Sequence, residues 1–415
     1  MIIGCGTTER FNSSLLLGYV VFFIAGYIIG SRLNRKSMRK IAIIGASYLQ
    51  APLIEKAKQM GLETHVFAWA ANDVGEKIAD YFYPISIVEK EEILSKCIEI
   101  GIDGICTIAS DLAAITANYV AAKMRLVGNS WDCTLKSTNK HLMRKCFKEY
   151  GDPSPKSIRV GDVDDLDGIE LLYPVIVKPL DRSGSRGITK LESADGLEEA
   201  IEVAKEQGFE DAALVEEFVE GQEYSVEYIS FKGKHQFLAL TYKYTTGAPH
   251  FIETGHLEPA PIDENKLSEI KRVTEHALDS LGIKYGASHT EIKINKDGII
   301  KIIEIGGRMG GDFIGSTLVK LSTGVDFVEQ VIRVSLGEEP EIKIGQGAYA
   351  GVRFIFNKND INIFNRLKEE RSDLLIDYEI NDITENKVTD SASRFGYFIV
   401  CANTLEEVQT YLPKD

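Results

Sequence analysis

The apolar positions in the first part of the chain alternate between short continuous runs and helical spacing. Residues 40–70 read as a buried strand ending at Gly45, a helix, and a second strand. Residues 93–111 repeat the helix and the strand. Strands that alternate with helices predict an open parallel sheet, here up to about residue 130. The sequence therefore predicts an α/β, Rossmann-like βαβ domain over residues 39–132.

The pattern changes after this point. An amphipathic helix ends at Gly151, and residues 174–191 read as a strand, a Gly/Ser/Arg loop and another strand. Residues 213–245 look like a run of antiparallel strands. This order predicts an α+β, two-lobed domain over residues 133–340, with a flap lobe at about 170–230. The pattern of residues 341–415 predicts a small α+β closing unit.

Residues 15–30 form a strongly apolar run without charge, and basic residues follow it. The basic flank lies after the run, which is the reverse of a cleavable signal peptide. Two interpretations stay open. The run is a membrane anchor with the bulk of the protein in the cytoplasm, or it lies outside the working protein, whose natural start is then Met38.

Composition excludes several classes of function. The formal net charge of −15 disfavours a nucleic-acid partner, which needs a basic face. The six cysteines show no CxxC and no zinc spacing, so we expect reduced, buried thiols in a cytosolic compartment. The first strand is followed by Gly45 alone, without G-x-G-x-x-G, so a dinucleotide site is not expected.

Two alternating apolar runs flank Asp297-Gly298 and predict a hairpin with a two-residue type I′ turn. In that register Glu291 lies directly across from Glu304. Neighbouring carboxylates repel each other unless a cation lies between them. The cation is either a divalent metal, Mg²⁺ or Mn²⁺, or a side chain such as Lys293.

The hairpin is followed by an arginine among glycines. Arg308 offers a forked cationic donor, and the flanking glycines let backbone amides come close to an anion. The alternative is a tight turn with a solvated arginine, which would not need so many glycines. The glycines are Gly306, Gly307, Gly310 and Gly311.

Other residues suit a nucleotide. Lys178 ends a strand before the Gly/Ser loop and could bind a phosphate, while Lys140 could equally be a solvated helix lysine. Glu216 or Glu217 could accept from an adenine amino group, and Glu223 could bind ribose or metal. Without the other features these would be ordinary surface acids.

Taken in this order, the motifs "VIVKPLDRSGSRG", "LVEEFVEGQEYSV", "HTEIKI" and "IEIGGRMGGD" resemble the ATP-grasp superfamily. The resemblance covers about residues 40–335. It implies that ATP is clamped between two lobes and that Glu291 and Glu304 bind Mg²⁺. The family motif E-x-N-x-R has Gly306 in place of its asparagine, which leaves the number of metal ions open. The implied ATP-binding residues are Lys140, Lys178, Ser183, Gly184, Ser185, Gly187, Glu216, Glu217, Val219 and Glu223.

The motif "EIGGRMGGD", together with "HFIETGHLEPAP", is similar to the L-amino-acid ligases. That resemblance places Glu253 and His256 at an amino-acid substrate, and Arg308, Gly310 and Gly311 at the reacting carboxylate and phosphate. Arg308 and Lys178 are the implied catalytic residues.

The implied function is an ATP-dependent carboxylate–amine ligase that forms an acyl phosphate and releases ADP. Its partners would be a small-molecule carboxylate and an amine, and relatives in this family are often homodimers. Other ATP-grasp chemistry, such as carboxylation or carbamoyl phosphate formation, and a non-catalytic nucleotide-binding role remain alternatives.

Overall fold

The computed structural model describes residues 38–182, 184, 186–248, 251–345, 347–384 and 388–414. Residues Lys40–Asp415 form one compact unit. The apolar run 15–30 lies outside the described residues. Within the described part of the chain, no helix is both long and apolar enough to cross a membrane.

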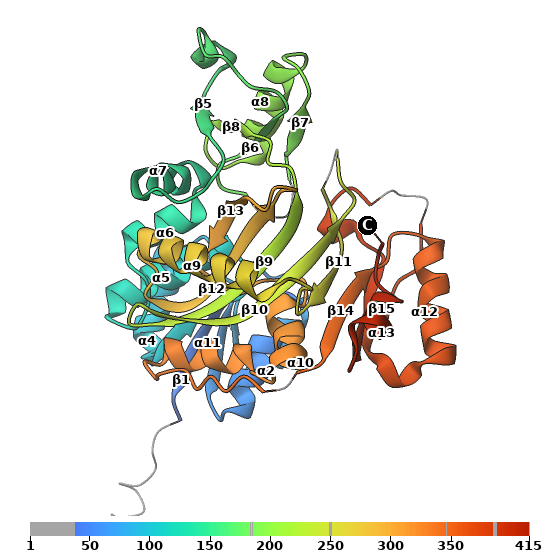
Figure 1. Cartoon of the computed structure of the whole chain (residues 1–415). Coiled ribbons are helices and arrows are strands. Elements are labelled where there is room, and N and C mark those ends of the chain that lie inside the picture. Colours follow the sequence, from blue (N-terminus) through green and yellow to red (C-terminus); the bar gives the residue numbers. More distant parts are fainter. Residues whose placement is uncertain are drawn as a thin grey trace, which may run out of the picture. The chain divides into compact units, whose positions relative to one another are not determined.

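The first sheet is parallel, with strand order β3-β2-β1-β4, as the alternating pattern predicts (blue in Figure 1). Pro52 near the start of the helix after β1 provides a fixed φ that suits a helix N-terminus. The elements are β1 (Lys40–Ile44), α2 (Ala51–Gln59), β2 (Glu63–Phe67), α3 (Val74–Ile78), β3 (Tyr81–Tyr83), α4 (Lys90–Ile100), β4 (Gly104–Cys106), α5 (Asp111–Met124), α6 (Trp131–Thr138) and α7 (Lys140–Tyr150).

A small antiparallel sheet follows, in the order β5-β8-β6-β7 with α8 packed on it (green, at the top of Figure 1). The predicted run of antiparallel strands is therefore divided between two sheets, because β8 pairs here and β9 pairs in the next sheet. The elements are β5 (Ser157–Val160), η1 (Val163–Leu166), β6 (Val175–Pro179), β7 (Thr189–Leu191), α8 (Leu197–Gln207) and β8 (Ala213–Glu217).

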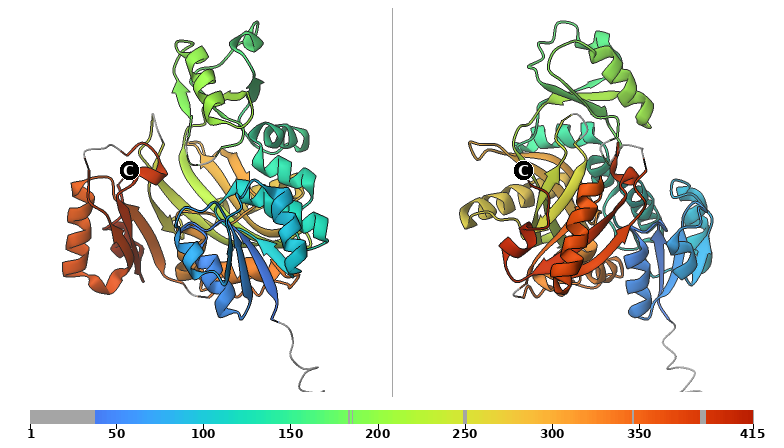
Figure 2. Two further views of the ribbon diagram at one scale, coloured as in Figure 1. Left: turned by 180° about the vertical axis from the view of Figure 1, so that it is seen from behind. Right: turned by 90° about the vertical axis from the view of Figure 1, so that its right-hand side faces the viewer.

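The large sheet has eight antiparallel strands in the order β13-β12-β9-β10-β11-β14-β16-β15. The C-terminal strands extend this sheet, and Figure 2 shows the last helices beside it. A parallel sheet followed by antiparallel sheets confirms the predicted fold class, while the domain boundaries stay predictions. The elements are β9 (Gln222–Phe231), β10 (Lys234–Thr245), β11 (Glu253–Glu258), α9 (Glu264–Leu281), β12 (Tyr285–Ile294), β13 (Ile300–Gly306), η2 (Ile314–Leu318), α10 (Val319–Thr323), α11 (Phe327–Ser335), β14 (Tyr349–Phe354), α12 (Lys358–Glu370), η3 (Ser372–Leu374), β15 (Leu375–Ile380), η4 (Ser391–Ser393), β16 (Gly396–Ala402) and α13 (Leu405–Gln409).

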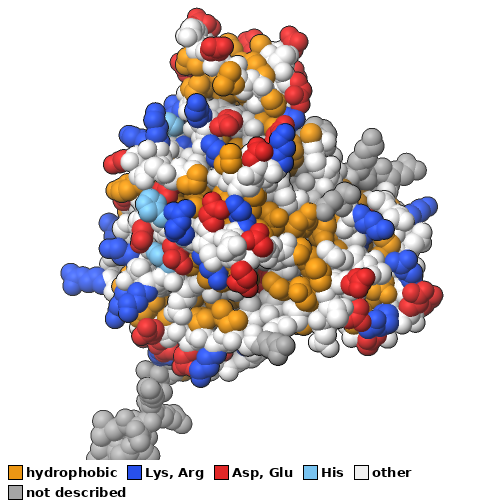
Figure 3. Space-filling model, viewed as in Figure 1, with side chains coloured by type: hydrophobic (Ala, Val, Ile, Leu, Met, Phe, Trp, Pro, Cys, Tyr) orange, Lys and Arg blue, Asp and Glu red, His pale blue; other side chains and the backbone are white. Residues whose placement is uncertain are grey.

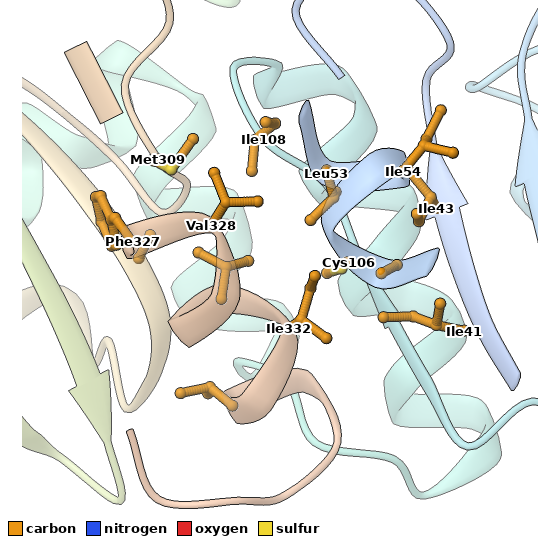
Figure 4. Packing of buried hydrophobic residues seen from close by; sticks show 14 of the residues in the cluster. Ile41, Ile43, Leu53, Ile54, Cys106, Ile108, Met309, Phe327, Val328 and Ile332 are labelled. Atoms are coloured by element: carbon orange, nitrogen blue, oxygen red, sulfur yellow. The ribbon is translucent and has the colours of Figure 1, made fainter. Parts of the chain in front are cut away.

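One apolar core joins the parallel sheet to the large sheet. Ile43 and Leu53 from the first sheet and α2 belong to the same cluster as Phe327 and Ile332 from α11 (Figure 4). Met309, from the loop after β13, is 1% exposed and part of the same cluster. Burial of apolar side chains stabilises such a contact by roughly 1.5–3 kcal/mol for each one. The loop carrying Arg308 is therefore fixed against the first sheet.

The face in Figure 3 carries acidic and basic side chains intermingled, with no single basic stripe. This distribution agrees with the acidic net charge of the chain.

Candidate active site

A cavity of about 650 Å³ has walls from all three sheets. The parallel sheet contributes the loops after β1, β2 and β4, and the small sheet contributes β6, β8 and the glycine loop. The large sheet contributes β11, β12 and β13. Nearly all the residues singled out from the sequence lie on this cavity. Three of its residues have positive φ although they are not glycines, Ala109 (57°), Phe251 (51°) and Asp312 (48°), and such strain tends to gather at functional sites.

Glu291 on β12 lies opposite Glu304 on β13, as predicted. The predicted turn is wrong, however. Next to the turn Ile294 pairs with Ile300, so the loop is longer than two residues, and the Gly298 amide donates to the Asn295 carbonyl oxygen. A bulge just past Glu291 shifts the register by one residue and restores the pairing of the two carboxylates.

Each of the two carboxylates is paired with a different lysine, and Lys243 also lies 2.7 Å from Glu223 Oε1. The Lys243 ammonium lies 2.7 Å from Glu291 Oε1, and the Lys140 ammonium lies 2.9 Å from Glu304 Oε1. Lys293, the residue suggested by sequence, instead lies 3.9 Å from Glu223. Burial raises the pKa of Glu291, but Lys243 and His289 outweigh it and hold that pKa well below its usual range. Glu291 is therefore a carboxylate anion at neutral pH.

The chemistry of Glu291 and Glu304 fits a hard divalent cation. Mg²⁺ is commonly held by one or two carboxylates, with water and substrate phosphates completing its shell. Among the described residues, no group of three or more His, Cys, Asp and Glu side chains converges on one point. Glu291 and Glu304 are the residues that would hold such a cation.

Lys178 lies on β6 inside a buried group of charges. Its ammonium contacts Glu216 on β8, and Arg144 on α7 donates to the other Glu216 oxygen at 3.1 Å. Burial lowers the pKa of Lys178, and Glu216 opposes this. The Glu216 carboxylate is paired with two buried cations, and its predicted adenine contact stays a prediction. Glu217, the next residue, is exposed and remains available on the cavity wall.

The predicted adenine side is an apolar slot on the small sheet. Ile176, Ile188, Phe218 and Val219 line it. The Lys293 ammonium lies 5.3 Å from the centre of the Phe218 ring, a cation–π distance. The Lys190 ammonium lies 4.2 Å from the same ring, so apolar side chains and two cations meet at this part of the cavity.

The glycine loop connects β6, which carries Lys178, to β7. Gly184 and Gly187 have φ of 77° and 65°, values that favour glycine, and Gly184 lines the cavity. The Arg182 carbonyl oxygen accepts a 2.7 Å hydrogen bond from the Lys140 ammonium. Ser183 and Ser185 lie outside the described residues, so their predicted phosphate contacts stay predictions.

Arg308 pairs with Asp111, the first residue of α5. Its Nε and Nη2 donate to the two Asp111 oxygens at 2.9 and 3.0 Å. Burial lowers the pKa of Arg308, but Asp111 outweighs it and raises that pKa overall. The guanidinium is held in a fixed direction on the cavity wall, where it can still face an anion.

The glycines around Arg308 allow close contacts within the protein. The Gly310 amide donates to Glu227 at 3.1 Å, and a Cβ at Gly310 would lie 2.7 Å from His289 Nδ1. Gly310 is not among the residues that line the cavity, and its predicted contact with substrate stays a prediction. Gly311 does line it, as predicted.

Glu253 and His256 lie on β11 at the same cavity. Glu253 Oε2 accepts from Arg394 at 3.2 Å, and its other oxygen lies 3.5 Å from Lys243. His256 is 1% exposed, and neither ring nitrogen has a hydrogen-bond partner within the described residues. Burial and the nearby cations hold the pKa of His256 well below its usual range, so the ring is neutral.

Sequence reasoning missed several charged residues in or next to this cavity, among them Asp111, Arg144, Lys243 and Arg394. The sequence could have indicated two of them. Asp111 follows the carboxyl end of β4, and Arg144 lies four residues after Lys140 on the same helix face. No pattern in the sequence indicated Lys243 or Arg394, since their partners are distant in the chain.

Part of the chain matches a known protein family. Residues 171–316 match the family model described as the ATP-grasp domain. The match runs from just before β6 to η2 and includes the arginine–glycine loop.

Curated relatives include the alanine–anticapsin ligase of Bacillus subtilis, 27% identical over 308 residues, which are 66% of this chain and 65% of that protein. The D-alanine–D-alanine ligase of Flavobacterium psychrophilum is 24% identical over 273 residues, covering 62% of this chain and 80% of that one. The chain thus spans less than two thirds of the length of the first of these relatives.

Among solved structures, the L-amino acid ligase of Bacillus licheniformis has a TM-score of 0.78 at 24% identity, covering 91% of this chain and 96% of that one. Phosphoribosylglycinamide synthetase of Anaerococcus prevotii has a TM-score of 0.71 at 21% identity, with 90% and 96% covered. These likenesses establish the fold.

Proposed function

We propose that this protein is an ATP-dependent carboxylate–amine ligase that activates the carboxylate of an amino acid as an acyl phosphate and releases ADP. One observation carries the proposal. Lys140, Lys178, Glu291, Glu304 and Arg308 come from separate parts of the chain and meet on one cavity. The relatives named as ligases support the same conclusion.

The cavity has residues suited to bind each part of ATP. The apolar slot beside Phe218 suits adenine, and Lys178 and Lys140 face the region between the slot and the carboxylate pair. Glu291 and Glu304 would hold Mg²⁺, which when bound neutralises phosphate charge. Lys140 is tied to Glu304 and to the glycine loop, so it is already oriented toward this region.

The reaction has two steps. A carboxylate oxygen attacks the γ-phosphorus, the bond to the β-phosphate oxygen breaks, and ADP leaves. The amine nitrogen then attacks the acyl carbon, phosphate leaves with the C–O bonding pair, and the amine loses a proton to solvent or to phosphate. Two anions meet in the first step, so the fixed guanidinium of Arg308 supplies charge neutralisation. Glu253 would contact a substrate ammonium only in competition with Arg394 and Lys243, which already pair with its two oxygens.

The test uses the full chain with Mg-ATP and a panel of single amino acids, with hydroxylamine as the amine. Hydroxylamine converts an acyl phosphate to a hydroxamate, which ferric iron detects, so the assay reports the activated carboxylate directly. We expect hydroxamate and ADP in equal amounts, dependent on the amino acid and on Mg²⁺.

Glu304→Gln is the decisive variant, and Glu206→Gln, on the exposed face of α8, is the matched control. We expect Glu304→Gln to lose at least 100-fold in rate, a loss typical of a removed charge-stabilising group. Two results would instead favour the other ATP-grasp reactions, provided that amino acids have no effect. One is hydroxamate formation from formate, and the other is ADP release that depends on bicarbonate. Tight ATP binding without any turnover would favour a non-catalytic role.

A further inference from the structure

The parallel sheet contributes large or apolar side chains to the cavity wall, beside the polar residues Ser47, Gln50, Asp73, Ser86 and Ser110. Five of these large or apolar residues are Tyr48, Leu49, Trp69, Ile87 and Ala109, and we refer to these five residues as the apolar wall. Trp69 is 72% exposed and Tyr48 is 56% exposed. Large aromatic side chains that stay exposed on the wall of a cavity mark a surface that gains free energy when a ligand covers it.

The apolar wall lacks charge. Among the cavity-lining residues between 45 and 110, Asp73 is the one charged side chain, and it takes part in the capping box at the N-terminus of α3. None of these cavity-lining residues from the first sheet is a cation that could bind a phosphate. The proposed nucleotide position lies elsewhere in the cavity, beside Phe218. The apolar wall therefore suits an uncharged, non-nucleotide group.

The apolar wall lies next to the arginine–glycine loop. The Ala109 amide donates to the Met309 carbonyl oxygen at 3.1 Å. A Cβ built on Gly311 would lie 3.3 Å from Ala109 Cβ and 4.0 Å from Leu49 Cδ2. A substrate whose carboxylate lies beside Arg308 would thus have this wall within reach of its side chain.

We propose that the apolar wall binds the side chain of the amino acid whose carboxylate is activated, and that it selects bulky apolar or aromatic side chains over small and charged ones. This inference rests on the proposed ligase function. One extra methylene in a fitted apolar pocket is worth roughly 10- to 200-fold in specificity. We expect phenylalanine, leucine or methionine to exceed alanine, aspartate and lysine at least tenfold in kcat/KM in the hydroxamate assay.

The first experiment measures this preference in Trp69→Ala, with Trp131→Ala as the matched control. Trp131 is 41% exposed on α6, is absent from the cavity wall and packs against Tyr119. We expect Trp69→Ala to raise the KM for the preferred amino acid about tenfold while changing kcat/KM for alanine less than twofold. An unchanged preference in Trp69→Ala, or a preference for charged amino acids in the original protein, would overturn the proposal.

A second measurement separates this proposal from the ligase function. The chain has two tryptophans, so Trp131→Phe leaves Trp69 as the single reporter of intrinsic fluorescence. We expect phenylalanine or leucine to change that fluorescence saturably in the presence of a non-hydrolysable ATP analogue, and aspartate to leave it unchanged. Hydroxamate formation without this response refutes the role of the wall and keeps the ligase. A selective response without any hydroxamate supports the wall as a binding site and refutes the ligase.

Discussion

Arg308 and Asp111 form a two-pronged ion pair at 2.9 and 3.0 Å, which joins the loop after β13 to the first turn of α5. The two residues are 197 positions apart in the chain. The pair connects the parallel sheet to the proposed centre of catalysis, and it fixes the guanidinium before any substrate arrives.

Asp111→Asn should lower kcat in the hydroxamate assay by about 10- to 100-fold, because loss of one anchor lets the guanidinium move and small misplacements are costly. Asp111 would act as a positioning residue, so the KM for ATP should change little. Asp132→Asn, on an exposed side chain of α6, is the control. A change confined to the KM for ATP would contradict this role.

Glu216→Gln should destabilise the protein strongly, because it leaves Lys178 and Arg144 buried without their shared anion. Removal of one partner from a buried ion pair typically costs about 3–5 kcal/mol in the free energy of unfolding. Denaturant unfolding measures this change. Glu217→Gln, one residue along and exposed, should cost no more than roughly 0.5 kcal/mol. Equal effects in the two variants would refute the buried-charge interpretation.

Gly310→Ala should also destabilise the chain, by about 1–3 kcal/mol, because its Cβ would lie 2.7 Å from His289 Nδ1 and 3.0 Å from Glu227 Oε1. Gly345→Ala is the comparison, since the nearest atom to its Cβ lies at 3.7 Å. Thermal unfolding of both variants provides the measurement. A Gly310→Ala protein with unaltered stability would show that the loop can relax freely.

Stability should depend on pH through Glu258, a buried residue of β11. Burial raises the pKa of this carboxyl to about 8, although Ser322 and Thr241 donate hydrogen bonds to it. Between the unfolded pKa near 4.5 and the folded pKa near 8, the folded protein holds a proton that the unfolded chain has lost. The contribution of Glu258 is therefore complete below about pH 4.5 and is lost as the pH rises through 8, with a slope of up to about 1.4 kcal/mol per pH unit.

The free energy of unfolding, measured in denaturant between pH 5 and pH 8, tests this pH dependence. The original protein is compared with Glu258→Gln. The variant cannot ionise, so its stability should fall less steeply over this range. Parallel curves for the two proteins would show that Glu258 titrates normally.

The sequence by itself determined the local features of this protein. Apolar periodicity was enough to predict the parallel sheet and the antiparallel sheets after it, because it reports which face of each element is buried. Short sequence motifs were also enough to predict that Glu291 lies opposite Glu304. They singled out Lys178 and Arg308 as well, and both line the cavity.

The tertiary structure decided how these charges are partnered. It committed Glu216 to Lys178 and Arg144, and it gave Lys140 and Lys243 to the carboxylate pair. It also placed the apolar wall beside Arg308. Ion pairs and cavity walls form between segments that are distant in sequence, and no periodicity along the chain encodes which of them meet. Those partnerships follow from the packing of the sheets against one another, which only the folded chain specifies.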